Sequence, residues 1–311
     1  MRDAHAIERA LRSVVRGEVR FDPFSRVLYS TDASLYQVMP VGVVIPRDEE
    51  DVVNTLRVAA DTKTPVVPRG GGTSLAGQSI GAAIVLDFSK YMDRIVRLDP
   101  GGPWALVQPG VVQDDLNRAA QPHGLRLGPD TSTSNRATLG GMIGNNSCGS
   151  RSVVYGKTMD HLLELRVLLA DGTEMTLRAL DPTSYQAKLQ DRGREGEIYR
   201  QLRDLVGRHA DEIERRFPKL LRRVSGYNLD SLLRNPADLT QLVAGSEGTL
   251  AVVVEARVRL VPRPRHTGLA ILHFPDVFTA LDTTPAILQH GPTAVELVDR
   301  MILDMTRQQL E

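Results

Sequence analysis

The sequence predicts a mixed α+β fold in more than one domain, and three observations lead to that class. The chain has 311 residues, which exceeds the size at which a single hydrophobic core keeps growing. Short apolar runs at residues 41–45 and 65–67 flank a helical pattern at 48–61, the order of a strand–helix–strand unit. Residues 162–169 and 174–177 are joined by Asp171-Gly172, a dipeptide typical of hairpin turns.

The first part of the chain alternates helical and strand patterns. Apolar residues from Ile7 to Val15 recur at helical spacing, which indicates an amphipathic helix. Four acidic residues at 48–51 are favourable in the first turn of a helix, where they face the positive end of its dipole. The expected elements are a helix at 4–15, a strand at 41–45, a helix at 48–61 and strands at 65–67, 84–88, 94–98 and 104–108.

The second part contains one long segment with little periodicity, residues 127–149, which is expected to be a binding loop. The longest helical pattern ends at Pro218, and a valine-rich strand leads into the proline-rich stretch 262–265, the expected domain boundary. The residues beyond it are few for an independent core, so the chain is expected to be a fragment of a longer protein. The expected elements are a helix at 111–121, the hairpin strands, a helix at 195–217, strands at 250–261, 268–274 and 294–298, and helices at 277–289 and 301–310.

The most informative stretch is residues 68–78, Pro-Arg-Gly-Gly-Gly-Thr-Ser-Leu-Ala-Gly-Gln. Three consecutive glycines let the backbone turn through positive φ and present successive N–H groups to an anion. The pattern is neither the Gly-x-Gly-x-x-Gly of dinucleotide-binding Rossmann folds nor a P-loop, because no Lys-[Ser/Thr] follows the glycines. A glycine triplet alone also occurs in surface turns. A second glycine-rich segment, 140–149, favours a shared dinucleotide ligand over that alternative.

Composition excludes several classes of function. Lys+Arg and Asp+Glu number 38 each, for a formal net charge of +0, so no charge excess favours nucleic acid or an anionic membrane. The single cysteine, Cys148, excludes an internal disulfide and is expected to be a small buried thiol. The seven histidines form no closely spaced pair, so no metal site is expected. No apolar run has the length of a transmembrane helix. A cytoplasmic location is expected, with peripheral contact to the inner face of a membrane left open.

Further motifs extend the glycine-rich pattern along the chain, in a fixed order from about residue 41 to residue 261. They are Pro109-Gly110, Pro129-Asp130, Thr138-Leu139-Gly140-Gly141, Asn146, Gly149, Tyr155-Gly156, Ala170-Asp171-Gly172, Gly226-Tyr227 and Gly245-Ser246-Glu247-Gly248-Thr249-Leu250. With residues 68–78 they resemble the FAD-binding domain of the vanillyl-alcohol oxidase/p-cresol methylhydroxylase (PCMH) flavoproteins. More narrowly, the chain resembles the D-2-hydroxy acid dehydrogenase branch, which includes D-lactate and D-2-hydroxyglutarate dehydrogenases and the glycolate oxidase D subunit. It looks most like the long members that are fused to an iron–sulfur domain.

The resemblance implies an α+β fold in which a PCMH-type FAD-binding domain of two α/β subdomains holds the cofactor between them. Tyr227 and Asn228 would lie in a segment that approaches the flavin ring. Val167 would lie against the adenine through its backbone, and Glu247 and Gly248 would touch the cofactor again. Pro68 and Pro109 would also contact the cofactor. The FAD pyrophosphate would be wrapped by the backbone amides of the first loop, Arg69, Gly70, Gly71, Gly72, Thr73 and Ser74, with Gln78. The other side would be lined by Pro129, Asp130, Ser134, Thr138, Gly140, Gly141, Asn146 and Gly149.

The resemblance also bears on how FAD is attached and where catalysis occurs. Thr73 stands where some members attach FAD through a histidine, so FAD is expected to be non-covalent here. Residues 1–36 are expected to form an N-terminal helical segment, 37–264 the FAD-binding domain and 265–311 the beginning of a substrate-binding cap. The catalytic residues, and any divalent metal or iron–sulfur cluster, are expected beyond Glu311. Glu296 and Asp299 are candidates for the cap face, with a solvated or structural role equally open.

The expected function is FAD-dependent oxidation of a D-2-hydroxy acid of the D-lactate, D-2-hydroxyglutarate or glycolate type to the 2-oxo acid, by hydride transfer to flavin N5. A quinone, a cytochrome or an iron–sulfur domain would accept the electrons, and the sequence allows a homodimer. Two alternatives stay open: a non-catalytic FAD-binding subunit of a glycolate-oxidase-like complex, and a flavin oxidase of another alcohol, such as an aldonolactone or an alkyl ether lipid precursor.

Overall fold

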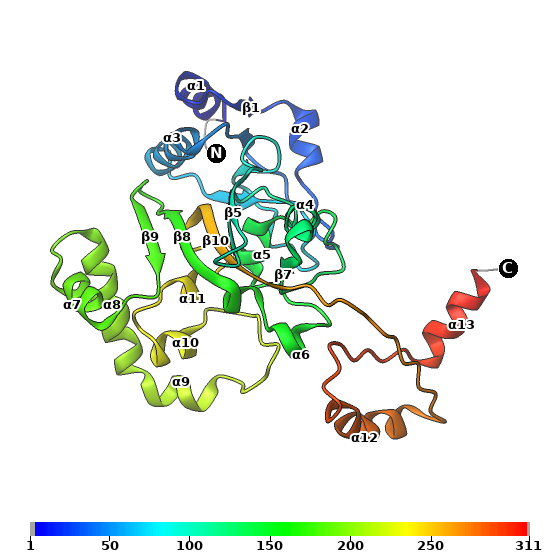
Figure 1. Ribbon diagram of the computed structural model, residues 1–311. Helices are drawn as coiled ribbons and strands as arrows, with labels where there is room; N and C mark the ends of the chain where they lie inside the picture. The colour runs from blue at the N-terminus through cyan, green and yellow to red at the C-terminus, as the bar shows by residue number, and fades with distance from the viewer. Residues whose placement is uncertain (1–3, 310–311) are drawn as a thin grey trace.

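The computed structural model describes residues 4–309, which form two lobes that each contain a β-sheet (Figure 1). The first sheet has the order β1-β2-β4-β3, from β1 (Glu18–Arg20), β2 (Gly42–Ile45), β4 (Ile84–Asp87) and β3 (Val66–Arg69). The last three strands run parallel, and β1 adds an antiparallel edge. The strand–helix–strand unit predicted from the sequence is confirmed.

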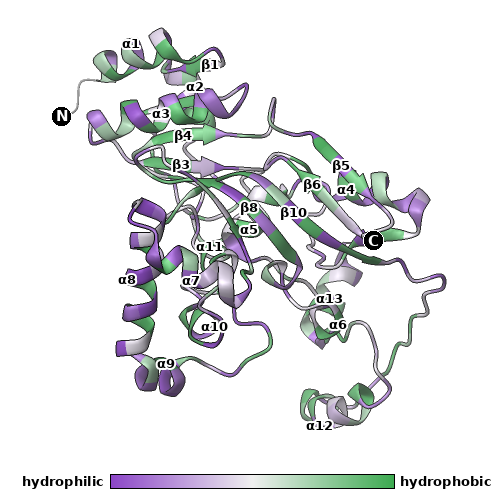
Figure 2. Ribbon diagram, turned by 60° about the vertical axis from the view of Figure 1, so that its left-hand side comes forward, coloured by the Kyte–Doolittle hydropathy of each residue, from purple (hydrophilic) through white to green (hydrophobic). Residues whose placement is uncertain are grey.

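Helices α1 (Ala4–Val14) and α3 (Glu49–Asp61) lie in layers over this first sheet (Figure 2). The alternation along the strands places Val44, Ile84 and Leu86 in the core that these helices share. The same core includes Val252 and Val254 of the second sheet, so the two lobes are joined by apolar packing. Burial of this kind contributes about 25 cal/mol per Å² of apolar surface.

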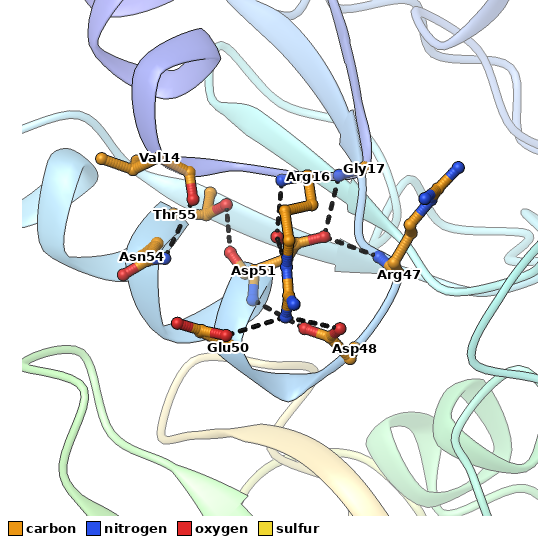
Figure 3. Close-up of polar contacts among 9 residues, drawn as sticks. All are labelled: Val14, Arg16, Gly17, Arg47, Asp48, Glu50, Asp51, Asn54 and Thr55. Atoms are coloured by element: carbon orange, nitrogen blue, oxygen red, sulfur yellow. Dashed lines mark hydrogen bonds and ion pairs between the residues drawn. The ribbon is translucent and has the colours of Figure 1, made fainter.

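A buried carboxylate fastens the N-terminal segment to α3 (Figure 3). Asp51, in the first turn of α3, accepts the backbone N–H of Arg16 at 2.8 Å and those of Gly17 and Arg47 at 2.9 Å each. The Arg16 guanidinium in turn pairs with Asp48 and Glu50. The acidic run at 48–51 therefore does more than favour a helix start, since it also anchors the chain that enters β1.

The second sheet is antiparallel, with the order β5-β6-β10-β8-β9. The strand β10 (Val252–Pro262) is its centre, and its far end also pairs with β7 (Leu125–Leu127). The predicted hairpin is confirmed as β8 (Leu162–Leu168) and β9 (Glu174–Arg178), in register from Glu164 opposite Arg178 to Leu168 opposite Glu174. The remaining strands are β5 (Ile95–Asp99) and β6 (Trp104–Val107).

Short helices cover the second sheet and connect its strands. Their large common core contains fully buried side chains such as Leu116, Leu139, Leu165 and Leu232. The helices are α4 (Gln113–Ala120), α5 (Leu139–Asn145), α6 (Ser152–Tyr155), α7 (Pro182–Gln190), α8 (Arg194–Arg208), α9 (Ala210–Arg216), α10 (Leu229–Arg234) and α11 (Thr240–Val243), with 3-10 turns at Gln121–His123 and Thr158–His161. In the first lobe, α2 (Pro23–Leu28) precedes β2.

Two predictions about the second lobe are wrong. The segment 127–149 was expected to be irregular, but it contains α5, because Leu139, Met142 and Ile143 follow helical spacing and are buried while Thr138 caps the helix. The single helix expected at 195–217 is two helices that meet at His209. Gly207 precedes the break, and glycine is among the least favourable residues in a helix interior.

The C-terminal residues extend away from both lobes and carry α12 (Val277–Leu288) and α13 (Arg300–Gln308) (Figure 1). These two helices are confirmed, although residue 310 of the predicted second helix lies outside the described residues. The strands predicted at 268–274 and 294–298 are absent from the described structure. A strand needs a hydrogen-bonding neighbour, and the side chains of Leu269 and Ile271 are 88% and 70% exposed here.

Candidate cofactor site

A cleft of about 380 Å³ lies where the loop after β3 faces the second lobe. Residues of the loop 68–79 form one wall, and residues from the segments 131–148 and 243–253 form the other. Clefts of this size between two structural units are common binding sites for small molecules and cofactors.

The conformation of the glycine loop depends on its contact with the second lobe. A Cβ atom on Gly70 would lie 2.0 Å from Thr138 Oγ1, and one on Gly71 would lie 2.3 Å from the carbonyl oxygen of Arg136. Gly72 has a φ of +64°, a left-handed conformation that favours glycine. The triplet therefore allows the loop to lie directly against residues 136–138, which brings the two glycine-rich segments together.

Several polar groups of the loop have no partner within the described chain. Among residues 4–309, the backbone N–H groups from Gly71 to Ser74 donate no hydrogen bond, and the buried Gln78 Oε1 accepts none. Polar groups in such positions are normally paired with protein, water or a ligand. Consecutive N–H groups of this kind suit the oxygens of a pyrophosphate. The loop therefore fits the phosphate-bearing part of a dinucleotide.

The opposite wall is built around α5. Thr138 caps this helix by accepting the N–H of Gly141 at 3.3 Å. The segment 245–248 docks on the other end of α5, where Glu247 N–H donates to the carbonyl oxygen of Gly144 at 3.0 Å. Glu247 has a φ of +52°, and Gly248 follows at +73°, so this turn is held in a left-handed conformation beside the cleft.

Three titratable side chains line the cleft: Arg69, Cys148 and Glu247. Burial raises the pKa of Glu247, whose Oε1 accepts a hydrogen bond from Asn145 Nδ2 at 2.9 Å that opposes the shift. Burial lowers the pKa of Arg69, and Asp87 opposes that change. Cys148 is partly exposed, so the prediction of a buried thiol is wrong. It follows the end of α5 and belongs to a loop that lines the cleft.

Most of the residues predicted to hold a cofactor meet at this cleft. The lining includes Pro68, Arg69, Gly70, Gly71, Gly72, Thr73, Ser74, Gln78, Pro109, Thr138, Gly140, Gly141, Glu247 and Gly248. It also includes residues that were not predicted to contact the cofactor: Leu75, Ala76, Ser79, Phe88, Thr131, Ser132, Thr133, Ala137, Met142, Gly144, Asn145, Ser147, Cys148, Val243, Ser246, Ala251 and Val253. Most of these residues lie within the motifs or next to them in the sequence, so proximity to the motifs was the available signal.

Six predicted residues lie outside the lining and have structural partners. Pro129 accepts Gln113 Nε2 through its carbonyl oxygen, and Asp130 Oδ1 accepts the N–H of Arg151. The Ser134 carbonyl accepts the N–H of Asp114.

The other three of the six are tightly packed. Asn146 is fully buried in a left-handed turn, where its Oδ1 accepts the N–H of Met159. Gly149 packs directly on the carbonyl oxygen of Asp130. Val167 is buried within β8, between Val253 of β10 and Met175 of β9.

The residues predicted to approach the flavin ring or the cap do not gather at the cleft. Tyr227 is exposed and its hydroxyl bonds that of Thr249 at 2.8 Å, whereas Asn228 is 1% exposed and its Nδ2 donates to the carbonyl oxygens of Gln241 and Ala244. Asp299 caps α13 by accepting the N–H of Ile302. No group of three or more His, Cys, Asp or Glu side chains that could hold a metal occurs within residues 4–309. None of the helices in that range is long and apolar enough to cross a membrane.

Two sheets with a glycine-lined cleft between them are the arrangement expected of an FAD-binding domain of the PCMH type. Residues 40–178 match the family described as an FAD binding domain. The chain is 37% identical over 302 residues to a D-2-hydroxyglutarate dehydrogenase of Pseudomonas putida, covering 96% of this chain and 30% of that protein. It is 32% identical over 296 residues to the glycolate oxidase subunit GlcD of Bacillus subtilis, covering 93% of this chain and 52% of the subunit. A solved structure of alkyldihydroxyacetonephosphate synthase shares the fold, with a TM-score of 0.59, 20% identity and coverage of 84% of this chain and 41% of that one.

The chain therefore contains an FAD binding domain and is a homologue of D-2-hydroxyglutarate dehydrogenases and of the glycolate oxidase subunit. The predicted resemblance is confirmed at this level. The chain spans about a third of the Pseudomonas relative and about half of the Bacillus subunit.

Proposed function

We propose that the chain is the FAD-binding part of a dehydrogenase that oxidises a D-2-hydroxy acid to the corresponding 2-oxo acid. The observation that carries this proposal is the cleft, in which unpaired loop amides and the Gln78 oxygen meet the glycine-rich wall of the second lobe. The similarity to D-2-hydroxyglutarate dehydrogenases along almost the whole chain supports the substrate class.

The chain's own residues would bind and orient the cofactor. The amides from Gly71 to Ser74 would hold the pyrophosphate, and the wall formed by α5 and the segment 245–248 would hold the remainder. Pro109, Glu247, Gly248 and the residues around Thr138 would fix its position. When bound, FAD supplies the acceptor for the hydride that leaves the carbon bearing the hydroxyl group. A general base must take the hydroxyl proton, and we place it beyond Glu311.

FAD is proposed to be held without a covalent bond, because Thr73 occupies the loop position at which a histidine would be needed. Among the described residues that line the cleft there is no histidine, but the thiol of Cys148 is present. Acid precipitation of the purified holoprotein tests the proposal. All flavin is expected in the supernatant, and yellow colour that stays with the precipitate would contradict non-covalent binding.

The substrate is tested with the product of the complete gene, an artificial electron acceptor and the D- and L-forms of lactate and 2-hydroxyglutarate, together with glycolate. Reduction of the acceptor is expected with a D-acid or with glycolate, and the L-acids serve as matched controls. Equal rates with both enantiomers, or activity only with other alcohols, would contradict the proposal. The natural electron acceptor, a homodimer and a cytoplasmic location stay predictions.

A further inference from the structure

The Arg69 side chain joins both ends of the glycine loop to an earlier segment of the chain. Arg69 is the last residue of β3, directly before the loop. Its Nη2 donates to the carbonyl oxygen of Thr31 at 2.9 Å, and its Nη1 donates to that of Ser79 at 3.2 Å. Thr31 precedes β2, and Ser79 follows the loop. The guanidinium group thus uses its planar fork on two backbone acceptors. A Cβ atom at position 72 would lie only 2.6 Å from Nη2, so the guanidinium lies close against Gly72.

Tyr29 and Asp87 form a second set of contacts around the Arg69 guanidinium group. Its central carbon lies 5.3 Å from the centre of the Tyr29 ring, within the range of a cation–π interaction. The Tyr29 hydroxyl donates to Asp87 Oδ2 at 2.5 Å, and Asp87 stands opposite Arg69 in the β3–β4 register. Arg69 is therefore held by stacking and by a nearby carboxylate, in a position determined by the first sheet.

The segment 29–33 also contacts the loop independently of Arg69. The N–H of Ala33 donates to the carbonyl oxygen of Gly72 at 3.1 Å. The Ser79 hydroxyl donates to Asp32 Oδ2 at 3.0 Å. The start, middle and end of the loop are each tied to residues 29–33, which lie before the matched FAD binding domain at 40–178.

We propose that Arg69 is a positioning residue that pre-organises the anion-binding loop. We further propose that residues 29–33 belong to the cofactor site because they hold this loop in its binding conformation. The proposal rests on FAD binding in the cleft. A loop with three consecutive glycines loses much conformational freedom when it closes on a ligand. Bonds that order the loop beforehand lower that cost and so raise affinity. Lysine would keep the positive charge but lacks the planar fork that reaches two acceptors.

The experiment compares Arg69→Lys and Asp32→Asn with the wild type and with Arg97→Lys. Arg97 also lies over an aromatic ring, that of Trp104, but it is outside the cleft lining. Dissociation constants are measured for FAD, for ADP, which carries the pyrophosphate, and for adenosine, which does not. Hydrogen exchange of peptides from residues 70–79 is measured in the apoprotein.

Both test variants are expected to weaken FAD and ADP binding by about tenfold or more, with adenosine unchanged and faster exchange confined to 70–79. Arg97→Lys is expected to behave as the wild type. Unchanged affinity for FAD and ADP in both test variants, with unchanged loop exchange, would overturn the proposal. If only Asp32→Asn weakened the binding of FAD and ADP, the positioning role of Arg69 would also be overturned. Asp32 is outside the cleft lining, so Asp32→Asn tests the segment even if Arg69→Lys does not fold. A wild-type protein that binds no FAD would instead contradict the proposed function.

Discussion

Replacement of Asp51 is expected to loosen the attachment of the N-terminal segment to the first lobe. The carboxylate is fully buried and accepts three backbone N–H groups, those of Arg16, Gly17 and Arg47. In Asp51→Ala all three backbone donors lose their acceptor. In Asp51→Asn one oxygen remains as an acceptor, but the side-chain NH2 group replaces the other oxygen. It then faces backbone N–H groups, which are also donors.

The size of the effect follows from these contacts. A hydrogen bond to a charged group contributes about 1.5–3 kcal/mol, and single substitutions rarely exceed about 4–5 kcal/mol in total. We therefore expect Asp51→Ala to lower the free energy of unfolding by about 3–5 kcal/mol and Asp51→Asn by about 2 kcal/mol. Residues 4–20, which include α1 and β1, would then detach more readily from the sheet.

Urea unfolding followed by circular dichroism measures the loss, and hydrogen exchange of peptides from residues 4–20 and 42–51 locates it. Glu50→Gln is the matched control. Glu50 forms an ion pair with the Arg16 side chain at 2.8 Å, but its own side chain is 68% exposed. Exposed pairs of this kind contribute at most about 1 kcal/mol. If Asp51→Ala were no more destabilising than Glu50→Gln, the reasoning about the buried carboxylate would be refuted.

Four further predictions concern the loop, the pH dependence and the thiol. Gly71→Ala is expected to prevent FAD retention, since its Cβ would lie 2.3 Å from the Arg136 carbonyl oxygen, whereas Gly207→Ala, whose Cβ meets nothing within 4 Å, is expected to retain FAD; flavin absorbance after gel filtration distinguishes them. Hydrogen bonds from Lys90, Tyr91 and Arg20 lower the pKa of Glu18 to about 2 from 4.5, so stability from this carboxylate is present above about pH 4.5 and is lost as pH falls toward 2. Glu18→Gln is expected to reduce the loss of stability between pH 4.5 and pH 2. An unchanged loss of stability would contradict this role of Glu18. Burial raises the pKa of Glu247, so its ionisation destabilises the apoprotein as pH rises above 4.5. Glu247→Gln is expected to raise the melting temperature at pH 7 but not at pH 4, and an equal difference at both values would argue against this cause. Cys148→Ala is expected to bind FAD as the wild type does, and flavin release on denaturation should be complete in both proteins.

The sequence predicted the strongly patterned elements of the fold. The parallel unit around the glycine loop and the hairpin at 162–178 have clear apolar patterns and turn residues, and both are confirmed. Helix α5 was missed because its sequence, Leu-Gly-Gly-Met-Ile-Gly-Asn, is rich in glycine and its helical state depends on burial of Leu139 and Ile143. The strands expected at 268–274 and 294–298 have strand-like sequences, but pairing cannot be read from a sequence pattern alone.

The cofactor cleft was predictable only in part. Glycine motifs identified both walls, because a glycine is required where the loop lies directly against another segment, as at Gly70 beside Thr138 Oγ1 and at Gly71 beside the Arg136 carbonyl oxygen. The side-chain role of Arg69 was not predictable, since it depends on Thr31 and Ser79, which the fold brings together from either side of the loop. Asn146 and Gly149 belong to the same motif but contribute to packing around the cleft rather than to its lining.

Titration of the apoprotein from the complete gene with FAD in a calorimeter shows directly whether this cleft holds FAD. We expect saturable binding at one site and a rise in melting temperature with FAD concentration, both lost in Gly71→Ala and retained in Gly207→Ala. A folded protein that shows neither binding heat nor any change in melting temperature with FAD would contradict FAD binding in the cleft.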